Sequence, residues 1–335
     1  MTMLTAQDFN NKRHIPVLLQ PVLNGMAPLN GATIIDGTFG AGGYTRAMLE
    51  EGANVIALDR DPEAIRDGRL MEKHYAPRLK LIETEFSNLD QVVDEPVDGV
   101  ILDIGVSSMQ IDEAERGFSF QKDGPLDMRM AQSGFTAADV VNEMKVSDLT
   151  RIFGLLGEER HAARIARMID EKRQTKPFLR TSDLADAIET LVGRKPGDHI
   201  HPATRVFQAL RIYVNDELGE LACALIAAER ILKAGGRLGV VTFHSLEDRM
   251  VKRFFTSRSG VNGGSRYLPE LSSQQPTFKL LFKGGVTADE EELQNNSRSR
   301  SARLRVGVRT DVPPMDDDLT IFGLPSISRF NGVRK

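Results

Sequence analysis

The 335-residue sequence contains no tryptophan and a single cysteine, Cys223. One thiol excludes an intramolecular disulfide, and it excludes zinc or iron–sulfur sites that need several cysteines. No run of about 18 apolar residues is present, so no membrane span is expected. Residues 1–14 lack the apolar core of a signal peptide. We therefore expect a cytoplasmic protein from a reducing compartment.

Charge of one sign is not in large excess either, because 43 lysines and arginines stand against 47 aspartates and glutamates, a net charge of −4. This balance excludes a globally basic, histone-like protein. It leaves nucleic acid open as a partner, since a local basic face is enough to bind it. The length suggests about two domains and a sizeable core.

Short apolar runs predict buried strands, and three of the first four end in an aspartate. The predicted strands cover residues 32–36, 54–59, 79–83, 97–103, 236–243, 278–282 and 303–309. Helical patterns over 44–51 and 62–72 separate the first strands. Strands and helices that alternate in this way indicate right-handed βαβ units and a parallel sheet.

Residues 112–200 contain almost no strand-like run and predict helices instead. These helices are expected over 137–144, 147–156, 159–173 and 182–192, with Ser147 and Ser182 as N-caps. The sequence therefore predicts an α/β fold with an all-helical domain inserted between strands 4 and 5. The domains are expected over 1–111 with 216–335, and over 112–215.

A long amphipathic pattern over 202–232 predicts one continuous helix that carries Cys223 as a core residue. A buried cysteine disfavours methylation at carbon 5 of cytosine, which needs a cysteine nucleophile at the substrate. A further helix is expected over 245–255, where Ser245 and Asp248 form a capping box.

The strongest local signal is the segment Asp36-Gly-Thr-Phe-Gly-Ala-Gly-Gly-Tyr44, directly after the first strand and before a helix. Its glycines allow a ligand to approach bare backbone beside the free N–H groups of the helix start. A dinucleotide fingerprint would place glycine at position 45, where this chain has Thr45, so an NAD site is disfavoured. The alternative is a tight turn without a ligand.

Three acids, Asp36, Asp59 and Asp103, close predicted parallel strands and are expected at one rim of the sheet. Carboxylates gathered there repel one another unless a cationic ligand lies among them. A sulfonium with an ammonium group meets this requirement better than a polyphosphate, which favours S-adenosylmethionine over NAD or ATP. Asp59 would accept from ribose hydroxyls and Phe86 would pack on adenine, although a strand cap and a core phenylalanine are the alternatives.

Basic residues cluster in three places, and in each a solvated charged face is the alternative to phosphate binding. The clusters are Arg298, Arg300, Arg303 and Arg305, one helical face with Arg160, Arg164 and Arg167, and a loop with Arg194 and Lys195. The histidines show no metal-ligand spacing, since His199 and His201 have no third ligand nearby, so no metal is expected. His244, near the expected rim, would contact substrate or cap a helix.

Several long segments of the chain resemble one known family, and they occur in the same order. They are Asp36–Gly43, Leu58–Pro62, Leu102–Phe120, Asp123–Arg129, Gly157–Arg160, His201–Arg211, Thr242–Arg249 and Ser299–Arg305. Together they resemble the MraW family of ribosomal RNA methyltransferases over nearly the whole chain. The resemblance implies a Rossmann-like class I methyltransferase that depends on S-adenosylmethionine and carries a helical insertion for substrate recognition.

The resemblance also implies the reaction, which is methyl transfer to the exocyclic N4 of a cytidine in the decoding centre of 16S rRNA. The implied partner is small-subunit rRNA, within an assembled or late-assembling small ribosomal subunit, and a homodimer is possible. Three alternatives are open: a methyltransferase acting on a small-molecule amine, a dinucleotide oxidoreductase and a non-catalytic ribosome-assembly factor.

The family's site residues carry over to positions of this chain. The donor-binding residues implied are Gly42, Gly43, Tyr44, Asp59, Phe86, Asp103 and Gln110. Asp103 is the candidate catalytic residue, with donor binding as its other role. The family usually has histidine at Tyr44 and proline at Met109. The predicted phosphate contacts are Arg298, Arg300, Arg303 and Arg305. Phe118 and Phe120 would stack on the target base or anchor the insertion.

Overall fold

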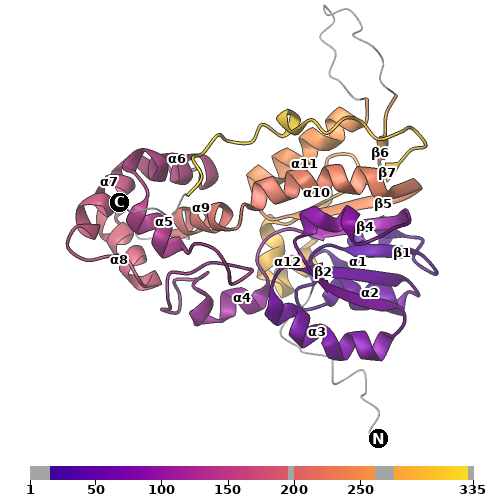
Figure 1. Cartoon of the computed structure of the whole chain (residues 1–335), viewed down its shortest axis with the longest axis horizontal. Coiled ribbons are helices and arrows are strands. Elements are labelled where there is room, and N and C mark those ends of the chain that lie inside the picture. Colours follow the sequence, from indigo (N-terminus) through magenta and orange to yellow (C-terminus); the bar gives the residue numbers. More distant parts are fainter. Residues whose placement is uncertain (1–15, 195–199, 261–274, 331–335) are drawn as a thin grey trace, which may run out of the picture. The chain divides into compact units, whose positions relative to one another are not determined.

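The computed structural model describes residues 16–194, 200–260 and 275–330 (Figure 1). The chain divides into two compact units. The first joins the described residues up to Gly105 with Gly219–Gly323, and the second joins Val106–Leu218 with the residues from Leu324 onward. Lys195 and His199 lie outside the described residues.

The C-terminal segment belongs to the helical unit, whereas the predicted domains placed it with the sheet. Hydrogen bonds explain this difference. The Tyr213 hydroxyl donates to the Ser328 carbonyl at 2.7 Å, and the Ser328 hydroxyl donates to Asp148 at 3.0 Å. Arg151 donates to the carbonyl of Ser326. Because such hydrogen bonds join residues far apart in sequence, no local sequence pattern predicts them.

A seven-stranded sheet with the order β3-β2-β1-β4-β5-β7-β6 forms the centre of the first unit. The strands are β1 Thr33–Asp36, β2 Asn54–Asp59, β3 Leu79–Glu83, β4 Val97–Asp103, β5 Leu232–Thr242, β6 Phe278–Leu280 and β7 Arg303–Arg309. Strands β1 to β5 pair in parallel, and β7 is antiparallel to both β5 and β6. The predicted α/β fold and its seven strands are confirmed.

Helices cover both faces of this sheet. They are α1 Leu19–Met26, α2 Gly43–Glu50, α3 Pro62–Tyr75, α10 Glu217–Ile231 and α11 Ser245–Arg258. The short helix α12 Glu290–Asn295 belongs to the same unit but buries none of its residues. A Cβ on Gly25 of α1 would meet Val306, and a Cβ on Gly307 would overlap the Phe255 ring of α11. Since neighbouring strand residues point to opposite faces, α1 and α11 cover opposite faces of β7.

The second unit is built from helices, which confirms the helical insertion between strands 4 and 5. They are α4 Ser108–Asp112, α5 Ala137–Glu143, α6 Val146–Leu156, α7 Ala162–Arg173, α8 Thr181–Val192 and α9 Thr204–Val214. Helix α6 packs against α7 and α9. Its Ile152 and Phe153 are fully buried, as are Ile165 of α7 and Leu210 of α9.

The single helix expected over 202–232 is in fact two helices, because α9 ends at Val214 and α10 begins at Glu217. Asp216 has a φ of +47°, which a continuing helix does not allow. The Asn215 side chain donates to the Met128 carbonyl at 2.8 Å and accepts from the Met130 N–H at 2.9 Å. These hydrogen bonds to residues distant in sequence stabilise the break between α9 and α10.

Two further predictions about helices are wrong. The N-caps of α6 and α8 are Lys145 and Arg180 rather than Ser147 and Ser182. Cys223 is exposed on α10 and is not a core residue. Burial of Cys223 therefore gives no reason to disfavour methylation at carbon 5 of cytosine. Among the described helices, none is long and apolar enough to cross a membrane.

Candidate functional site

The carboxyl ends of β1, β2 and β4 bring three predicted acids together, and we call Asp36, Asp59 and Asp103 the acidic rim. Asp36 is in register with Ala57 of β2 and Ile101 of β4. Asp59 and Asp103 therefore lie two residues further along, on either side of β1. Residues two apart on a strand share a face, so the three side chains leave the same side of the sheet.

The glycine-rich loop between β1 and α2 is fixed against β2. The Gly40 N–H donates to Asp59 Oδ2 at 2.7 Å, and the Phe39 N–H donates to the Leu58 carbonyl at 2.8 Å. Gly42 has a φ of +76°, and a Cβ there would lie 2.8 Å from Met71 Cε. Glycine at this position is thus required by conformation and by packing, whether or not a ligand binds.

Asp36 stabilises the glycine-rich loop by accepting hydrogen bonds from Thr38 and Thr45. It is buried, and its carboxylate accepts from the Thr45 hydroxyl at 2.6 Å and from the Thr38 N–H at 3.1 Å. Burial raises its pKa above the ordinary value, against the lowering effect of these bonds. Thr45, which departs from the dinucleotide fingerprint, therefore has a structural partner of its own.

Asp59 combines burial with two backbone donors. Its carboxylate accepts from the Gly40 N–H at 2.7 Å and from the Asp61 N–H at 2.8 Å. Burial nevertheless raises the pKa of Asp59 to about 6, and the charges of Asp61 and Asp36 act in the same direction. Each carboxylate oxygen keeps a second acceptor position, which suits it to a pair of hydroxyl donors.

Asp103 has the least satisfied side chain of the acidic rim. Its N–H donates to the Thr38 hydroxyl at 2.7 Å, but its Oδ1 is buried and has no hydrogen-bond partner among the described residues. Burial raises the pKa of Asp103 well above its ordinary value, and Asp36 and Glu247 raise it further. A buried carboxylate oxygen without a partner is costly, so this position fits a cation or an N–H donor.

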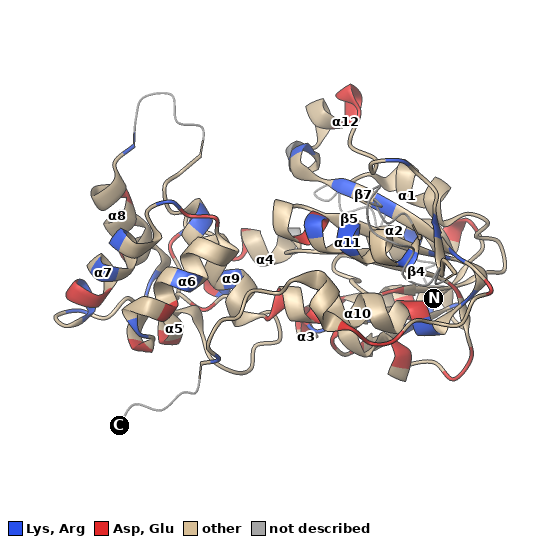
Figure 2. Ribbon diagram, turned by 90° about the horizontal axis from the view of Figure 1, so that it is seen from above, with Lys and Arg blue, Asp and Glu red and all other residues tan. Residues whose placement is uncertain are grey.

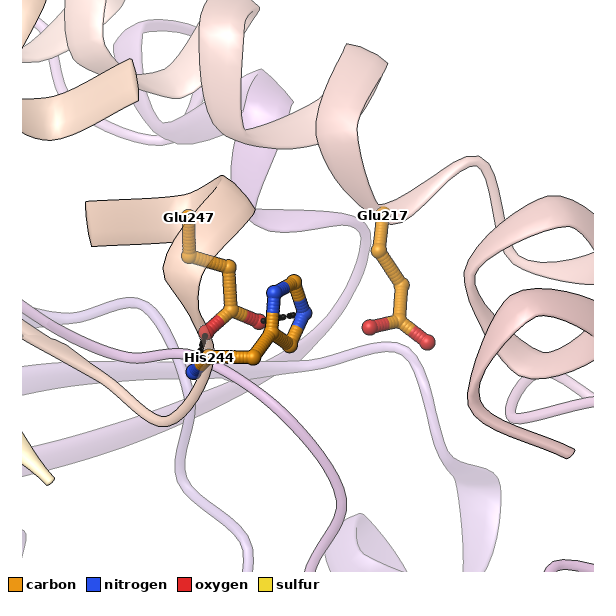
Figure 3. Close-up of side chains that lie close together, drawn as sticks. All are labelled: Glu217, His244 and Glu247. Carbon is orange, nitrogen blue, oxygen red and sulfur yellow. Dashed lines mark hydrogen bonds and ion pairs between the residues drawn. The ribbon is translucent and has the colours of Figure 1, made fainter. Parts of the chain in front are cut away.

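His244 and Glu247 lie at the end of β5 and the start of α11 (Figure 3). Glu247 is fully buried, and its Oε2 accepts from the N–H groups of Phe243 at 2.8 Å and His244 at 3.2 Å. Its Oε1 lies 2.9 Å from Nε2 of His244. His244 is the N-cap of α11, so the capping box predicted for Ser245 and Asp248 is one residue out of place.

Three other predicted donor-binding residues differ in environment. Tyr44 is buried, and its hydroxyl donates to the Val17 carbonyl, which leaves its backbone for a ligand. Phe86 is partly exposed and begins the 3-10 helix Phe86–Gln91. Gln110 belongs to the second unit, where its amide oxygen accepts from the Ser107 N–H at 3.1 Å and caps α4.

The predicted phosphate-binding arginines differ in environment. Arg298 and Arg300 are exposed. The Arg303 side chain is 42% exposed, and its Nη1 lies 3.6 Å from Asp248 Oδ2. Arg305 is 9% exposed, and its Nε and Nη2 donate to the two Asp248 oxygens at 2.8 and 3.1 Å. The prediction for Arg305 is therefore corrected, because its guanidinium joins β7 to α11 instead of facing solvent.

Sequence reasoning missed Thr38 and Glu247 and left the role of Phe120 open. Thr38 bridges two rim acids through its N–H and its hydroxyl. The sequence signal for Thr38 is its position two residues after Asp36, the acid that ends β1. The centroid of the Phe120 ring lies 4.8 Å from the ring centroid of Phe207 and 4.6 Å from that of His201, which fits the anchoring role.

Comparisons with known proteins show what the chain as a whole is similar to. The chain is 69% identical over 332 residues to ribosomal RNA small subunit methyltransferase H of Bartonella tribocorum, covering 99% of this chain and all of that protein. The protein of the same name from Brucella anthropi is 65% identical over 329 residues, covering 96% of this chain and 95% of that protein.

The model of the MraW methylase family matches residues 11–310. A cationic methyl donor fits the acidic rim, because its positive charge would offset the repulsion among the clustered carboxylates. The chain therefore belongs to the MraW methylase family, whose methyl donor is S-adenosylmethionine.

Proposed function

We propose that this chain transfers a methyl group from S-adenosylmethionine to the exocyclic N4 of a cytidine in the decoding centre of 16S rRNA. The observation that carries the proposal is the acidic rim beside the glycine-rich loop, in a chain that is 69% identical to a protein named for small-subunit rRNA methylation. The atom and the nucleotide follow from the family resemblance. An unpartnered acceptor at the rim, Asp103 Oδ1, supports an N–H group as the methyl acceptor.

The proposed donor site uses both backbone and side chains. Gly42, Gly43 and the backbone of Tyr44 give close access at the start of α2, and Asp59 accepts from the two ribose hydroxyls. Phe86 packs on the adenine, and Gln110 completes the donor-binding set. The bound donor supplies a methyl group on a positively charged sulfur.

The acceptor amine is a poor nucleophile because its lone pair is delocalised into the cytosine ring. A carboxylate oxygen that accepts one of its N–H bonds favours a pyramidal nitrogen with a localised lone pair. Asp103 Oδ1 has the free acceptor position for this role. The cytosine must first be flipped out of its stack, and the helical domain over 112–215 is proposed to recognise the surrounding RNA.

Asp103→Asn separates a catalytic role from donor binding. If Asp103 acts on the amine, the variant keeps its affinity for S-adenosylmethionine in calorimetry and loses about 10²-fold or more in turnover. Equal losses of affinity and turnover would reject the catalytic role. Asp98→Asn is the matched control, because Asp98 lies on the same strand and pairs with Thr33 and Lys233. Neither quantity should change in that control.

The activity itself is tested by methyl transfer from labelled donor to small ribosomal subunits, followed by nucleoside analysis. A small-molecule methyltransferase would bind the donor and leave the subunits unlabelled. A non-catalytic assembly factor would bind the subunits without needing the donor.

A further inference from the structure

Four arginines of the second unit, Arg160, Arg164, Arg167 and Arg205, are exposed, and we call them the arginine surface. Among the described residues, none of the four has an acidic side chain within the 4.0 Å that defines an ion pair. Some other cations of the same unit are paired, such as Arg180 with Asp123 and Lys176 with Asp183. The arginine surface is therefore a concentration of uncompensated positive charge.

Local packing places the four arginines on one side of the unit. Arg164 and Arg167 lie on the outer face of α7, whose inner face buries Ile165 and Ile169. Figure 2 shows lysine and arginine positions on α7. The loop that carries Arg160 rests on the first turn of α9, because Arg205 Nη1 donates to the Glu158 carbonyl at 3.0 Å. A Cβ on Gly157 of this loop would overlap the Arg205 carbonyl.

These charges stand where folding alone does not favour them. Arg164 lies in the first turn of α7 and Arg205 in the first turn of α9. Neither helix has a side-chain N-cap or an acid in its first turn. The start of a helix carries partial positive charge and favours anions, so cations there are unfavourable for the isolated fold. An anionic ligand would remove this conflict and use the planar guanidinium groups as paired donors.

We propose that the arginine surface binds backbone phosphates of RNA. The inference rests on the proposed function for its choice of polyanion, and it assigns this contact to residues outside the acidic rim and outside the arginines near β7. Nearby acids limit the charge but do not cancel it. Glu159 accepts from the His161 N–H at 2.7 Å, and Glu171 follows Arg167 by one turn on α7. Removing Glu171 should therefore strengthen binding.

The test measures binding of a fluorescein-labelled single-stranded RNA of about 20 nucleotides by anisotropy, without methyl donor, between about 50 and 200 mM salt. Replacing the four arginines by glutamine should reduce the magnitude of the negative slope of log association constant against log salt concentration by about 3, since each contact contributes about 0.7. The loss should be similar for RNAs of different sequence, because phosphate contacts do not read bases. Glu171→Gln should tighten binding and steepen the slope.

A matched control removes four exposed charges that are already ion-paired, through Arg66→Gln, Arg69→Gln, Lys176→Gln and Arg180→Gln. Its salt slope should stay near that of the unmodified protein. Equal slopes in the two fourfold variants would overturn the proposal. If the arginine variant does not fold, Arg164→Gln with Arg167→Gln suffices, because both side chains point outward, and a slope lowered by about 1.4 is expected.

The outcome is distinguishable from failure of the proposed function. Donor affinity measured by calorimetry should be unchanged in the arginine variant, since the acidic rim is untouched. If the chain methylates a different acceptor, the difference in salt slope between the two fourfold variants still decides whether this surface binds RNA phosphates.

Discussion

Asp59 is subject to two opposing effects that a change of pH can separate. Its two backbone hydrogen bonds favour the carboxylate, whereas burial raises its pKa to about 6. At pH 7 the group is mostly ionised and able to accept from two hydroxyls. Below pH 6 it is mostly protonated and loses part of that acceptor capacity.

Affinity for S-adenosylmethionine should therefore fall as the pH is lowered from about 7.5 to 5, approaching tenfold per unit below the pKa. A cationic ligand lowers the pKa of Asp59, so binding near pH 6 should release protons. Calorimetry in buffers of different ionisation enthalpy measures both effects. Asp59→Asn should bind more weakly and flatten the profile between pH 5 and 7. An unchanged profile in that variant would show that another group is responsible.

A comparison of Gly42 with Gly31 separates the effect of backbone conformation on stability from the effect of packing. Gly42 and Gly31 have φ values of +76° and +77°, but a Cβ meets Met71 and Phe39 at Gly42 and nothing within 4 Å at Gly31. Gly31→Ala should cost about 1 kcal/mol from backbone strain alone. Gly42→Ala should cost about 1–3 kcal/mol more, from overpacking. Urea unfolding of the two variants measures the difference, and equal losses would contradict the packing argument.

At the residue scale, the sequence predicted what depends on position along a strand. Asp59 and Asp103 could be singled out because acids at the ends of parallel strands meet at one rim. The environments of Tyr44, Cys223 and Arg305 could not be predicted in this way. Each depends on a neighbour distant in sequence, such as Asp248 for Arg305, or on which side of a helix faces the core.

At the scale of elements, strands were predicted more reliably than helix ends. The apolar runs of β2, β4 and β7 begin and end where the structure has them, because burial on both faces leaves a continuous signal. Helix starts shifted because Lys145 and Arg180 took the cap positions that the serines were expected to fill. Helices α1, α4 and α12 were not predicted at all.

The contact between α11 and β7 gives a prediction at this scale. Arg305 and Asp248 form a paired hydrogen bond, with side chains 9% and 23% exposed. A double-mutant cycle with Arg305→Gln and Asp248→Asn should give a coupling of about 1–2 kcal/mol in unfolding free energy. Arg300→Gln, at an exposed position of the same segment, should change stability by less than about 0.5 kcal/mol. A coupling near zero would return Arg305 to the set of candidate RNA contacts.

At the scale of the whole molecule, donor and RNA contacts are assigned to different residues. The acidic rim belongs to the first unit, and the arginine surface belongs to the second. This separation explains how a chain with a net charge of −4 can bind a cationic donor and a polyanion.

The two activities should therefore separate in variants. Asp59→Asn should lower donor affinity and leave the salt slope of RNA binding unchanged. The fourfold arginine variant should do the opposite. Calorimetry with the donor and anisotropy with RNA, applied to both proteins, check this. Loss of both properties in either variant would contradict the assignment.

The central claim is tested most directly by transfer of a labelled methyl group to small ribosomal subunits that lack their native methylations, followed by nucleoside analysis. We expect labelled N4-methylcytidine with the unmodified protein and with Asp98→Asn, and strongly reduced label with Asp103→Asn. Label in any other nucleoside, or donor binding without a labelled nucleoside, would contradict it.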